Sequence, residues 1–257
     1  MKTYDPDRVA RFKSRRIAPE PFWKMPMIDI PETPIVLEMP AKGQLRARRT
    51  ISRSAPRPTT KFPSIRLGRS IHCESDIEVE TAEWFDACST VKTFGEQPLT
   101  IHYEIAGQCR IHIPDFLVIT DDGKAFVEAK FIIDIDDDIY TRTWILKKAL
   151  FDIGYRYYLV TENETRGGNY LANARYLLRR GRAVVPDTLK FEFISRLRSG
   201  EALTWGGLTA AQQFHVARLI LQGVLWVPMH LPISPSTALL LPSQKQEEQP
   251  WLSHLLN

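Results

Sequence analysis

The sequence predicts an α/β fold, and three observations from the middle of the chain favour it. Two apolar runs, 113–120 and 125–131, flank an Asp-Gly turn and indicate a β-hairpin. Apolar residues recur at helical spacing before the hairpin, over 77–88, and a second helix is predicted after it, over 140–151. A further apolar run, 155–161, indicates a closing strand. Strands and helices therefore alternate along this segment.

The predicted hairpin collects charged side chains on one face. If its loop is Asp122-Gly123, counting back along the ladder puts Asp115 opposite Lys130. Because side chains alternate along a strand, Asp115, Glu128 and Lys130 share one face and apolar side chains occupy the other. We expect two carboxylates and an ammonium group to converge there.

Such a group of side chains suits a divalent cation. Two neighbouring carboxylates raise one another's pKa unless a cation lies between them, and hard oxygen ligands are those that Mg²⁺ prefers. A nearby lysine can polarise a water molecule and stabilise charge on an attacked phosphate. The implied chemistry is phosphodiester hydrolysis. The alternative is that Glu128 and Lys130 are solvated residues of an edge strand and that Asp115 only begins the hairpin.

A second set of residues lies upstream. Ser75 and Glu78 have the spacing of a capping box, which predicts that Glu78 lies in the first turn of the helix leading into the sheet. The alternative interpretation is that Glu78 does no more than cap this helix.

Four motifs in order give the segment a family resemblance. They are Glu-Ser-x-x-Glu (74–78), Val-x-x-Phe-x-x-Gln-Pro (91–98), Pro-Asp-Phe-Leu-Val (114–118) and Val-Glu-Ala-Lys (127–130). Together they resemble the TnsA-type endonucleases of heteromeric cut-and-paste transposons, over roughly residues 70–165 and more weakly to about 240. These enzymes belong to the restriction-endonuclease-like, or PD-(D/E)xK, superfamily. The resemblance implies a core of one helix, a three-stranded meander, a second helix and a further strand.

The resemblance also implies roles for individual residues. Glu78, Asp115 and Glu128 match the metal-binding acids, and Lys130 matches the catalytic lysine. Gln97 matches the Gln-Pro motif, for which we expect a supporting role near the site. The expected cofactor is Mg²⁺, for which Mn²⁺ can substitute.

The resemblance also implies that the chain is one subunit of a heteromeric transposase. It would cut double-stranded DNA at the 5′ side of transposon ends, next to an integrase-like transposase subunit and under a regulatory ATPase subunit. Two alternatives stay open: a restriction or repair nuclease of the same fold, and a non-catalytic adaptor that only binds DNA or protein.

Charge is distributed unevenly along the 257 residues, although the net charge is only +4 and the hydrophobic content is 44%. Residues 1–70 carry 16 Lys and Arg against 6 Asp and Glu, whereas residues 71–257 carry 18 against 24. Arginine-rich, proline-broken segments can follow a phosphate backbone, and we expect residues 42–69 to clamp DNA in this way; the alternative is a solubilising leader. For Lys147 and Lys148 the alternative is a solvated helix face. The candidate DNA contacts are Arg46, Arg48, Arg49, Arg53, Arg57, Lys61, Lys147 and Lys148.

We predict four segments along the chain. They are a basic arm (1–70), a restriction-endonuclease-like nuclease domain (71–165), a winged-helix-like C-terminal domain (166–240) and a tail (241–257). Residues 162–168 have the composition of a linker. Beyond them, predicted helices over 170–180 and 209–222 precede a predicted strand over 224–228, an order that suits a winged-helix-like domain. Both DNA and a partner protein stay open as its ligand.

The remaining signals concern compartment. Cys73, Cys88 and Cys109 have no Cys-x-x-Cys spacing, which argues against a zinc module and favours a reducing compartment. His102 and His112 fall at predicted strand positions, where packing is commoner than catalysis. No apolar run reaches the ~18 residues of a membrane span, and the N-terminus lacks an apolar signal-peptide core. We expect a cytoplasmic protein without a membrane partner.

Overall fold

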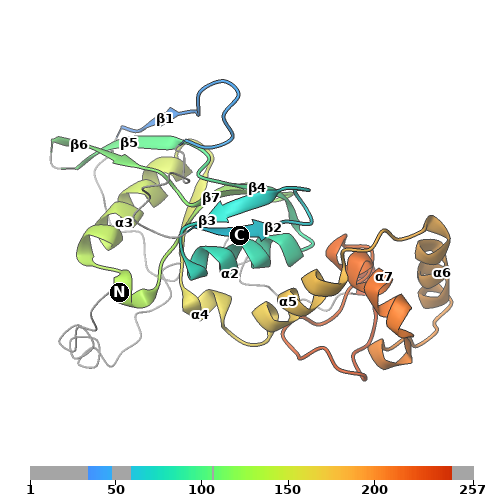
Figure 1. Cartoon of the computed structure of the whole chain (residues 1–257). Helices are drawn as coiled ribbons and strands as arrows, with labels where there is room; N and C mark the ends of the chain where they lie inside the picture. The colour runs from blue at the N-terminus through green and yellow to red at the C-terminus, as the bar shows by residue number, and fades with distance from the viewer. Residues whose placement is uncertain (1–33, 48–58, 106, 245–257) are drawn as a thin grey trace.

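The structure is a computed structural model that describes residues 34–47, 59–105 and 107–244 (Figure 1). The described strands are β1 (Val36–Glu38), β2 (Thr60–Pro63), β3 (Ser70–Cys73), β4 (Val91–Glu96), β5 (Thr100–Ile105), β6 (Gln108–His112), β7 (Phe116–Thr120), β8 (Lys124–Ala129) and β9 (Arg156–Val160). The described α-helices are α2 (Asp76–Ala87), α3 (Asp137–Phe151), α4 (Glu162–Thr165), α5 (Tyr170–Arg180), α6 (Asp187–Arg198) and α7 (Ala210–Leu221). Short 3-10 turns lie at Ile132–Asp134, Trp205–Gly207 and Pro242–Gln244.

A four-stranded sheet in the order β4-β7-β8-β9 forms the centre of the molecule. The first three strands are antiparallel neighbours, and β9 joins β8 in parallel after the crossover through α3. Along the chain this gives α2, three antiparallel strands, α3 and a last strand, with the β5–β6 hairpin inserted between β4 and β7. The fold is therefore mixed α/β, as predicted, and compatible with an α/β nuclease core.

Helices cover both faces of this sheet. On one face the ring of Phe85 in α2 lies 5.5 Å from Phe94 and 5.6 Å from Phe116, measured between ring centroids. On the other face Leu146 and Leu150 of α3 pack into one buried cluster with aromatic side chains of β8 and β9. Five consecutive residues of β8, 125–129, are buried as a result. A polar side chain on this strand must therefore find its partners inside the protein.

The turn between β7 and β8 is longer than predicted. Four residues, 120–123, lie between the last paired residues, Ile119 and Lys124, where the sequence predicts only the pair Asp122-Gly123. The N–H of Thr120 donates to the carbonyl of Gly123 at 3.0 Å, and its Oγ1 accepts the N–H of Asp122 at 3.1 Å. Hydrogen bonds to Thr120 thus close a wider turn than the Asp-Gly pattern alone indicates.

The longer turn moves the strand register by two residues. Phe116 pairs with Val127, so Asp115 lies opposite Glu128, and the predicted pairing of Asp115 with Lys130 is wrong. Because the shift is even, each side chain stays on its predicted face of the hairpin. The two acids move closer together than the sequence predicts.

Part of the predicted basic arm belongs to folded structure. β1 pairs with β5, and β2 pairs with β3 in a two-stranded sheet that lies beside α2 in Figure 1. Phe62 and Ile71, which oppose each other on β2 and β3, are buried in the core that includes α2. Apolar alternation in these short strands outweighs the basic, proline-rich composition of residues 1–70.

The region after β9 is helical. Residues predicted as a linker include α4, whose first turn is closed by a capping box between Thr161 and Glu164. α6 was not predicted, whereas α5 and α7 match predicted helices. Figure 1 shows α6 and α7 away from the central sheet, with α5 lying between them and α2. None of the helices among the described residues has the length and apolar composition needed to cross a membrane.

The predicted strand over 224–228 is wrong. Only isolated bridges occur there, between Trp226 and Leu240 and between Thr204 and Ala238. Val227 is buried among the helices instead of pairing along a ladder. A winged-helix architecture is therefore not shown for this region, and the predicted domain boundaries stay predictions.

Asp86, in the last turn of α2, fastens the β2–β3 hairpin to that helix. Its side chain is buried, and Oδ1 accepts the hydroxyl of Ser64 at 2.6 Å and the N–H of Arg66 at 2.9 Å. Oδ2 accepts the N–H of Ile65 at 2.8 Å. One carboxylate thus holds the whole turn that follows β2.

We predict that Asp86→Ala lowers the free energy of unfolding by about 2–4 kcal/mol, because it leaves three partly buried donors without their acceptor. Urea denaturation measures this change. Glu104→Ala, at an exposed position of β5, is the control and should stay within about 0.5 kcal/mol of the wild type. A loss for Asp86→Ala no greater than that of the control would contradict the prediction.

Candidate active site

Asp115, Glu128 and Lys130 meet at one end of the central sheet. Asp115 directly precedes β7, Glu128 is the penultimate residue of β8, and Lys130 follows β8. The Nζ of Lys130 lies 3.0 Å from Oε1 of Glu128 and 3.8 Å from Oδ2 of Asp115. The two carboxylate side chains are only 12% and 4% exposed. The structure thus brings together the two acids and the amine that the hairpin pattern predicts.

Asp115 is poorly solvated and close to another acid. Its Oδ2 accepts one backbone hydrogen bond, from the N–H of Ala129 at 2.8 Å. Burial, and then the neighbouring charge of Glu128, raise the pKa of Asp115 well above its usual range, although Lys130 opposes them. In the protein alone, this carboxyl group therefore favours a proton or a cation.

Glu128 behaves in the opposite way. Burial opposes its ionisation, but contacts with His112, Lys130 and Arg142 outweigh burial and lower its pKa to about 2. Nη2 of Arg142 lies 3.1 Å from Oε1, and Nε2 of His112 lies 3.2 Å from Oε2. Two adjacent acids thus differ in proton affinity because one has three cationic or polar partners and the other shares a single lysine.

Sequence reasoning missed the supporting roles of His112, Arg142 and Tyr157. Nε2 of His112 also hydrogen-bonds the hydroxyl of the fully buried Tyr157 at 2.9 Å. Oε2 of Glu128 therefore has an electrostatic contact with His112 but no hydrogen-bond partner among the described residues. His112 is buried, and nothing in the sequence connects it or Arg142 with Glu128.

Glu78 lies near this group, but its carboxylate is committed to the cap of α2. Oε1 accepts the hydroxyl of Ser75 at 2.9 Å, and Oε2 accepts the N–H of Glu74 at 2.8 Å. Burial raises the pKa of Glu78, while these hydrogen bonds and the charge of Lys130 oppose the rise. Glu78 also contributes to the raised pKa of Asp115. It therefore acts on the site through its charge without joining the contacts of Lys130.

The described part of the chain contains no preformed metal-binding site. No three His, Cys, Asp or Glu side chains there lie close enough together to hold a metal ion. The structure gathers Asp115 and Glu128 and leaves Glu78 in its helix cap. Of the three acids predicted to meet, two are in place.

Gln97 connects the helix cap to Asp115. Its N–H donates to the carbonyl of Asp115 at 2.8 Å, and its Nε2 donates to Oε1 of Glu74 at 3.1 Å. The backbone of Gln97 has φ of +46°, in the left-handed region that residues other than glycine adopt rarely and only where the surrounding structure imposes it. The geometry is what a supporting residue requires, because Gln97 joins α2 to the start of β7.

Most of the predicted DNA contacts are not tested by the structure. Arg48, Arg49, Arg53 and Arg57 lie outside the described residues.

The remaining candidates have varied surroundings. Lys61 is exposed on β2, and Arg46 lies 3.8 Å from the buried Glu96. On α3, Lys148 pairs with Asp152 at 3.2 Å, and Nζ of Lys147 lies 5.4 Å from the ring centroid of Trp144.

The acidic run 134–138 has a structural role. The side chain of Asp136 caps α3 by accepting the N–H of Ile139 at 2.8 Å, and Asp137 and Asp138 lie in the first turn. Acidic residues stabilise the N-terminus of a helix through its dipole. Asp136, Asp137 and Asp138 therefore stabilise the start of α3.

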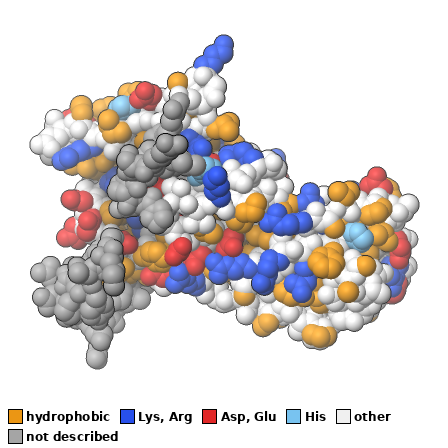
Figure 2. All heavy atoms as spheres, in the orientation of Figure 1, with side chains coloured by type: hydrophobic (Ala, Val, Ile, Leu, Met, Phe, Trp, Pro, Cys, Tyr) orange, Lys and Arg blue, Asp and Glu red, His pale blue; other side chains and the backbone are white. Residues whose placement is uncertain are grey.

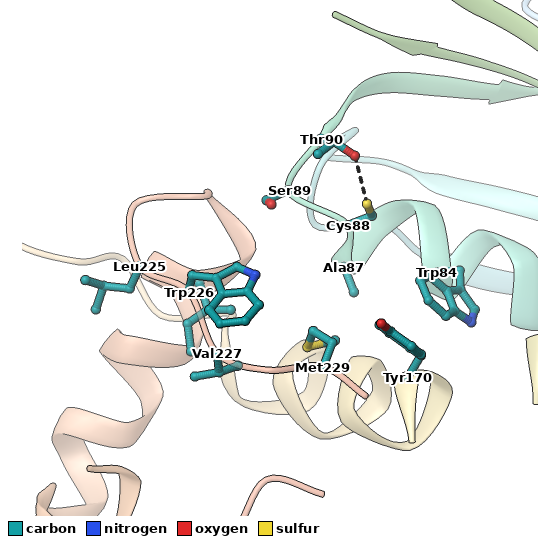
Figure 3. A pocket seen from close by; sticks show the side chains of 11 residues that line it. Trp84, Ala87, Cys88, Ser89, Thr90, Tyr170, Leu225, Trp226, Val227 and Met229 are labelled. Carbon is teal, nitrogen blue, oxygen red and sulfur yellow. Dashed lines mark hydrogen bonds between the residues drawn. The ribbon is translucent and has the colours of Figure 1, made fainter. Parts of the chain in front are cut away.

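A small apolar cavity of about 50 Å³ lies elsewhere, between the C-terminal end of α2 and the segment that follows α7 (Figure 3). Trp84, Tyr170, Trp226 and Met229 contribute to its lining, and no carboxylate, histidine or lysine does. It therefore offers no acid–base chemistry, and the acids beside Lys130 form the candidate active site.

Comparison with known families agrees with this location. Residues 88–162 match a family model described as TnsA-like endonuclease N terminal. The match spans β4 to β9 and includes Gln97, Asp115, Glu128 and Lys130, while Glu78 precedes it. No curated protein matches the chain. The resemblance to TnsA-type endonucleases is confirmed over this segment.

The opposite pKa shifts of the two acids predict opposite effects of neutralising them. Asp115→Asn should raise the free energy of unfolding at pH 7 by about 1–2 kcal/mol, because an acid whose folded pKa is raised destabilises the fold when it is ionised. Glu128→Gln should lower it by about 2–4 kcal/mol, because it leaves buried cationic partners unpaired. Urea denaturation in EDTA measures both.

The pH dependence gives the control. The advantage of Asp115→Asn should fade as the pH falls towards about 4, where the unfolded chain also binds the proton. The stabilising effect of the Glu128 charge should be present above about pH 4 and lost only as the pH approaches about 2. Shifts of the same sign for both variants at pH 7 would refute the assignment.

Proposed function

Because residues 88–162 of this chain form a TnsA-like endonuclease domain, we propose that the protein is the metal-dependent endonuclease subunit of a heteromeric transposase. It hydrolyses a phosphodiester of double-stranded DNA at the 5′ side of transposon ends. The observation that carries the proposal is the buried group formed by Asp115, Glu128 and Lys130 inside the matched segment.

The donors at this site suit Mg²⁺, with Mn²⁺ as a substitute. Asp115 and Glu128 would hold the ion, because both offer hard carboxylate oxygens and Oε2 of Glu128 has no hydrogen-bond partner among the described residues. A cation would also relieve the repulsion that keeps the pKa of Asp115 high. Glu78 is the third candidate ligand. A bound Mg²⁺ supplies Lewis-acid stabilisation of the charge that develops on an attacked phosphate.

Lys130 adds a fixed positive charge. Burial opposes its protonation, but Asp115 and Glu128 outweigh burial and raise its pKa, so the amine stays charged at neutral pH. Held 3.0 Å from Glu128, its ammonium group can orient the attacking water and stabilise the phosphate in the transition state. The N–H of Ala129 and the side chain of Arg142 keep the two acids in place.

Other subunits complete the proposed reaction. An integrase-like transposase subunit would cut and join the 3′ ends, and a regulatory ATPase subunit would control both. The helical C-terminal region offers a place for partner or DNA contacts beside the nuclease core, since α5 packs against α2. We further propose a cytoplasmic location, which suits the three free cysteines.

The test of catalysis is a strand-cleavage assay with the partner transposase and Mg²⁺ or Mn²⁺. Asp115→Ala and Lys130→Ala should each reduce nicking of the 5′ strand by about 10²-fold or more, because each removes a group that acts on the reacting atoms. Lys124→Ala, at the other end of the same hairpin, is the matched control and should cleave like the wild type.

Two results would replace the proposal. Equal nicking by wild type, Asp115→Ala and Lys130→Ala would remove the catalytic assignment and favour an adaptor. Efficient cleavage of naked DNA without any transposase would favour a restriction or repair nuclease.

Glu78 needs its own test, since its carboxylate has a structural use. If Glu78 is a metal ligand, Glu78→Gln should raise the Mg²⁺ concentration for half-maximal cleavage by about 10-fold or more, because the amide keeps the side-chain length but loses the charge. Titration of the cleavage rate with Mg²⁺ measures this.

Ser75→Ala provides the matched control for that variant. It removes the hydroxyl that bonds Glu78 and should cost about 1 kcal/mol of stability without changing the Mg²⁺ requirement. If Glu78→Gln needs no more Mg²⁺ than the wild type, Glu78 caps the helix and nothing else.

A further inference from the structure

An open groove of about 420 Å³ lies between the β2–β3 hairpin and the C-terminal helices. Its hairpin side is formed by Pro63, Ser64, Ile65, Gly68, Arg69 and Ser70, and its other side by Arg182 and Arg218. The lining contains three arginines and no acidic residue. Figure 2 shows Lys and Arg side chains gathered over the region where α2 and α5 adjoin.

The groove is held in shape by hydrogen bonds between its walls. Asp86 of α2 holds the backbone of the turn that begins at Ser64. Nη2 of Arg66, in the same turn, donates to the carbonyls of Cys88 at 2.8 Å and Leu221 at 3.3 Å. The hairpin, α2 and α7 are therefore joined at this point, and the groove is preformed.

Two of its arginines keep their charge uncompensated. Within the described part of the chain, the side chains of Arg182 and Arg218 each donate to one backbone carbonyl, of Pro63 and of Gly181, both at 3.4 Å. Neither makes an ion pair with a carboxylate among residues 34–47, 59–105 and 107–244. Arg69 differs, because it forms a two-pronged pair with the buried Glu96 at 2.9 and 2.8 Å.

Strand β3 connects the groove to the candidate active site. It begins at Ser70 in the groove and ends at Cys73, next to Glu74, which contacts Gln97 and Glu78. At about 3.3 Å per residue, the strand spans roughly 13 Å from Ser70 to Glu74. Because phosphates of one DNA strand follow each other every ~3.4 Å along the duplex axis, this distance is about four base steps.

We propose that Arg182 and Arg218 bind a backbone phosphate of the substrate DNA, about four base steps from the bond that is cut. The proposal rests on the proposed nuclease function. Arginine forks match phosphate geometry, and the exposed hydroxyl of Ser70 adds a donor on the opposite wall. An acidic segment of a partner protein is the competing ligand, but β3 leads from the groove to Glu74, which hydrogen-bonds Gln97 beside Asp115, and this continuity favours DNA.

Binding of a fluorescein-labelled DNA duplex by the full chain, measured by anisotropy at several salt concentrations, tests the groove without any cleavage. The variant Arg182→Ala/Arg218→Ala should bind about 10-fold or more weakly at low salt. Its slope of log K against log salt should fall by about 0.9, because the contact with one phosphate is lost. Arg182→Ala alone should lose part of that slope, whereas its control Arg198→Ala, at an exposed position of α6, should lose none.

A second measurement locates the contact. Replacing single phosphates by neutral methylphosphonates should weaken binding of the wild type at about four base steps from the cut and leave the double variant unaffected. Arg218→Lys, which keeps the charge of this half-buried position, should retain the salt slope of the wild type and shows that loss of folding is not the cause.

The outcomes separate this proposal from the proposed function. A reduced salt slope in the groove variants supports the groove even if no strand is cut. Equal slopes for Arg182→Ala and Arg198→Ala overturn the groove even if the wild type cleaves DNA. Unchanged DNA binding together with lost binding of a polyglutamate probe also overturns it and assigns the groove to a protein partner.

Discussion

The burial of two acids beside one amine is the constraint on which the candidate site depends. Helices on both faces of the sheet exclude water from β8. The carboxylate of Glu128 contacts Lys130, Arg142 and His112 in place of water. Asp115 has only one backbone N–H and a share in the same lysine, and its pKa rises. Ionised Asp115 therefore has an electrostatic cost in the folded chain. The proposed cation would offset that cost on binding, as functional sites commonly exchange stability for binding.

The faces of the central hairpin could be predicted from the sequence, whereas its register could not. Alternation along a strand has a period of two, so any even shift keeps Asp115, Glu128 and Lys130 on one face. The shift itself depends on Thr120, whose backbone and hydroxyl close a wider turn around Gly123. Turn length is decided by local hydrogen bonds that an Asp-Gly pair does not determine. The sequence therefore predicts which side chains share a face more reliably than it predicts which residues pair across the strands.

Residues that act through tertiary contacts escaped prediction for a different reason. Arg142 reaches Glu128 only because α3 packs on the sheet with one particular rotation, and helical periodicity does not specify that rotation. Glu78 illustrates the reverse case. Its capping pattern with Ser75 predicts the start of α2 correctly, and the structure has its carboxylate in that cap, away from the other two acids. Composition misled near the N-terminus, where the buried Phe62 outweighs its basic neighbours, and over residues 162–168, where α4 lies in a predicted linker.

Helix α2 gives the site and the groove a common frame. Its first turn carries Glu78, and its last turn carries Asp86, which holds the hairpin turn beside the groove. The eight residue steps from Glu78 to Asp86 span about 12 Å of helix, close to the ~13 Å from Ser70 to Glu74 along β3. The strand β3 and the helix α2 therefore set a similar separation between the groove and the helix cap that contains Glu78. A phosphate held at Arg182 and Arg218 would stand at a fixed distance from Lys130, so binding there would restrict which bond reaches the acids.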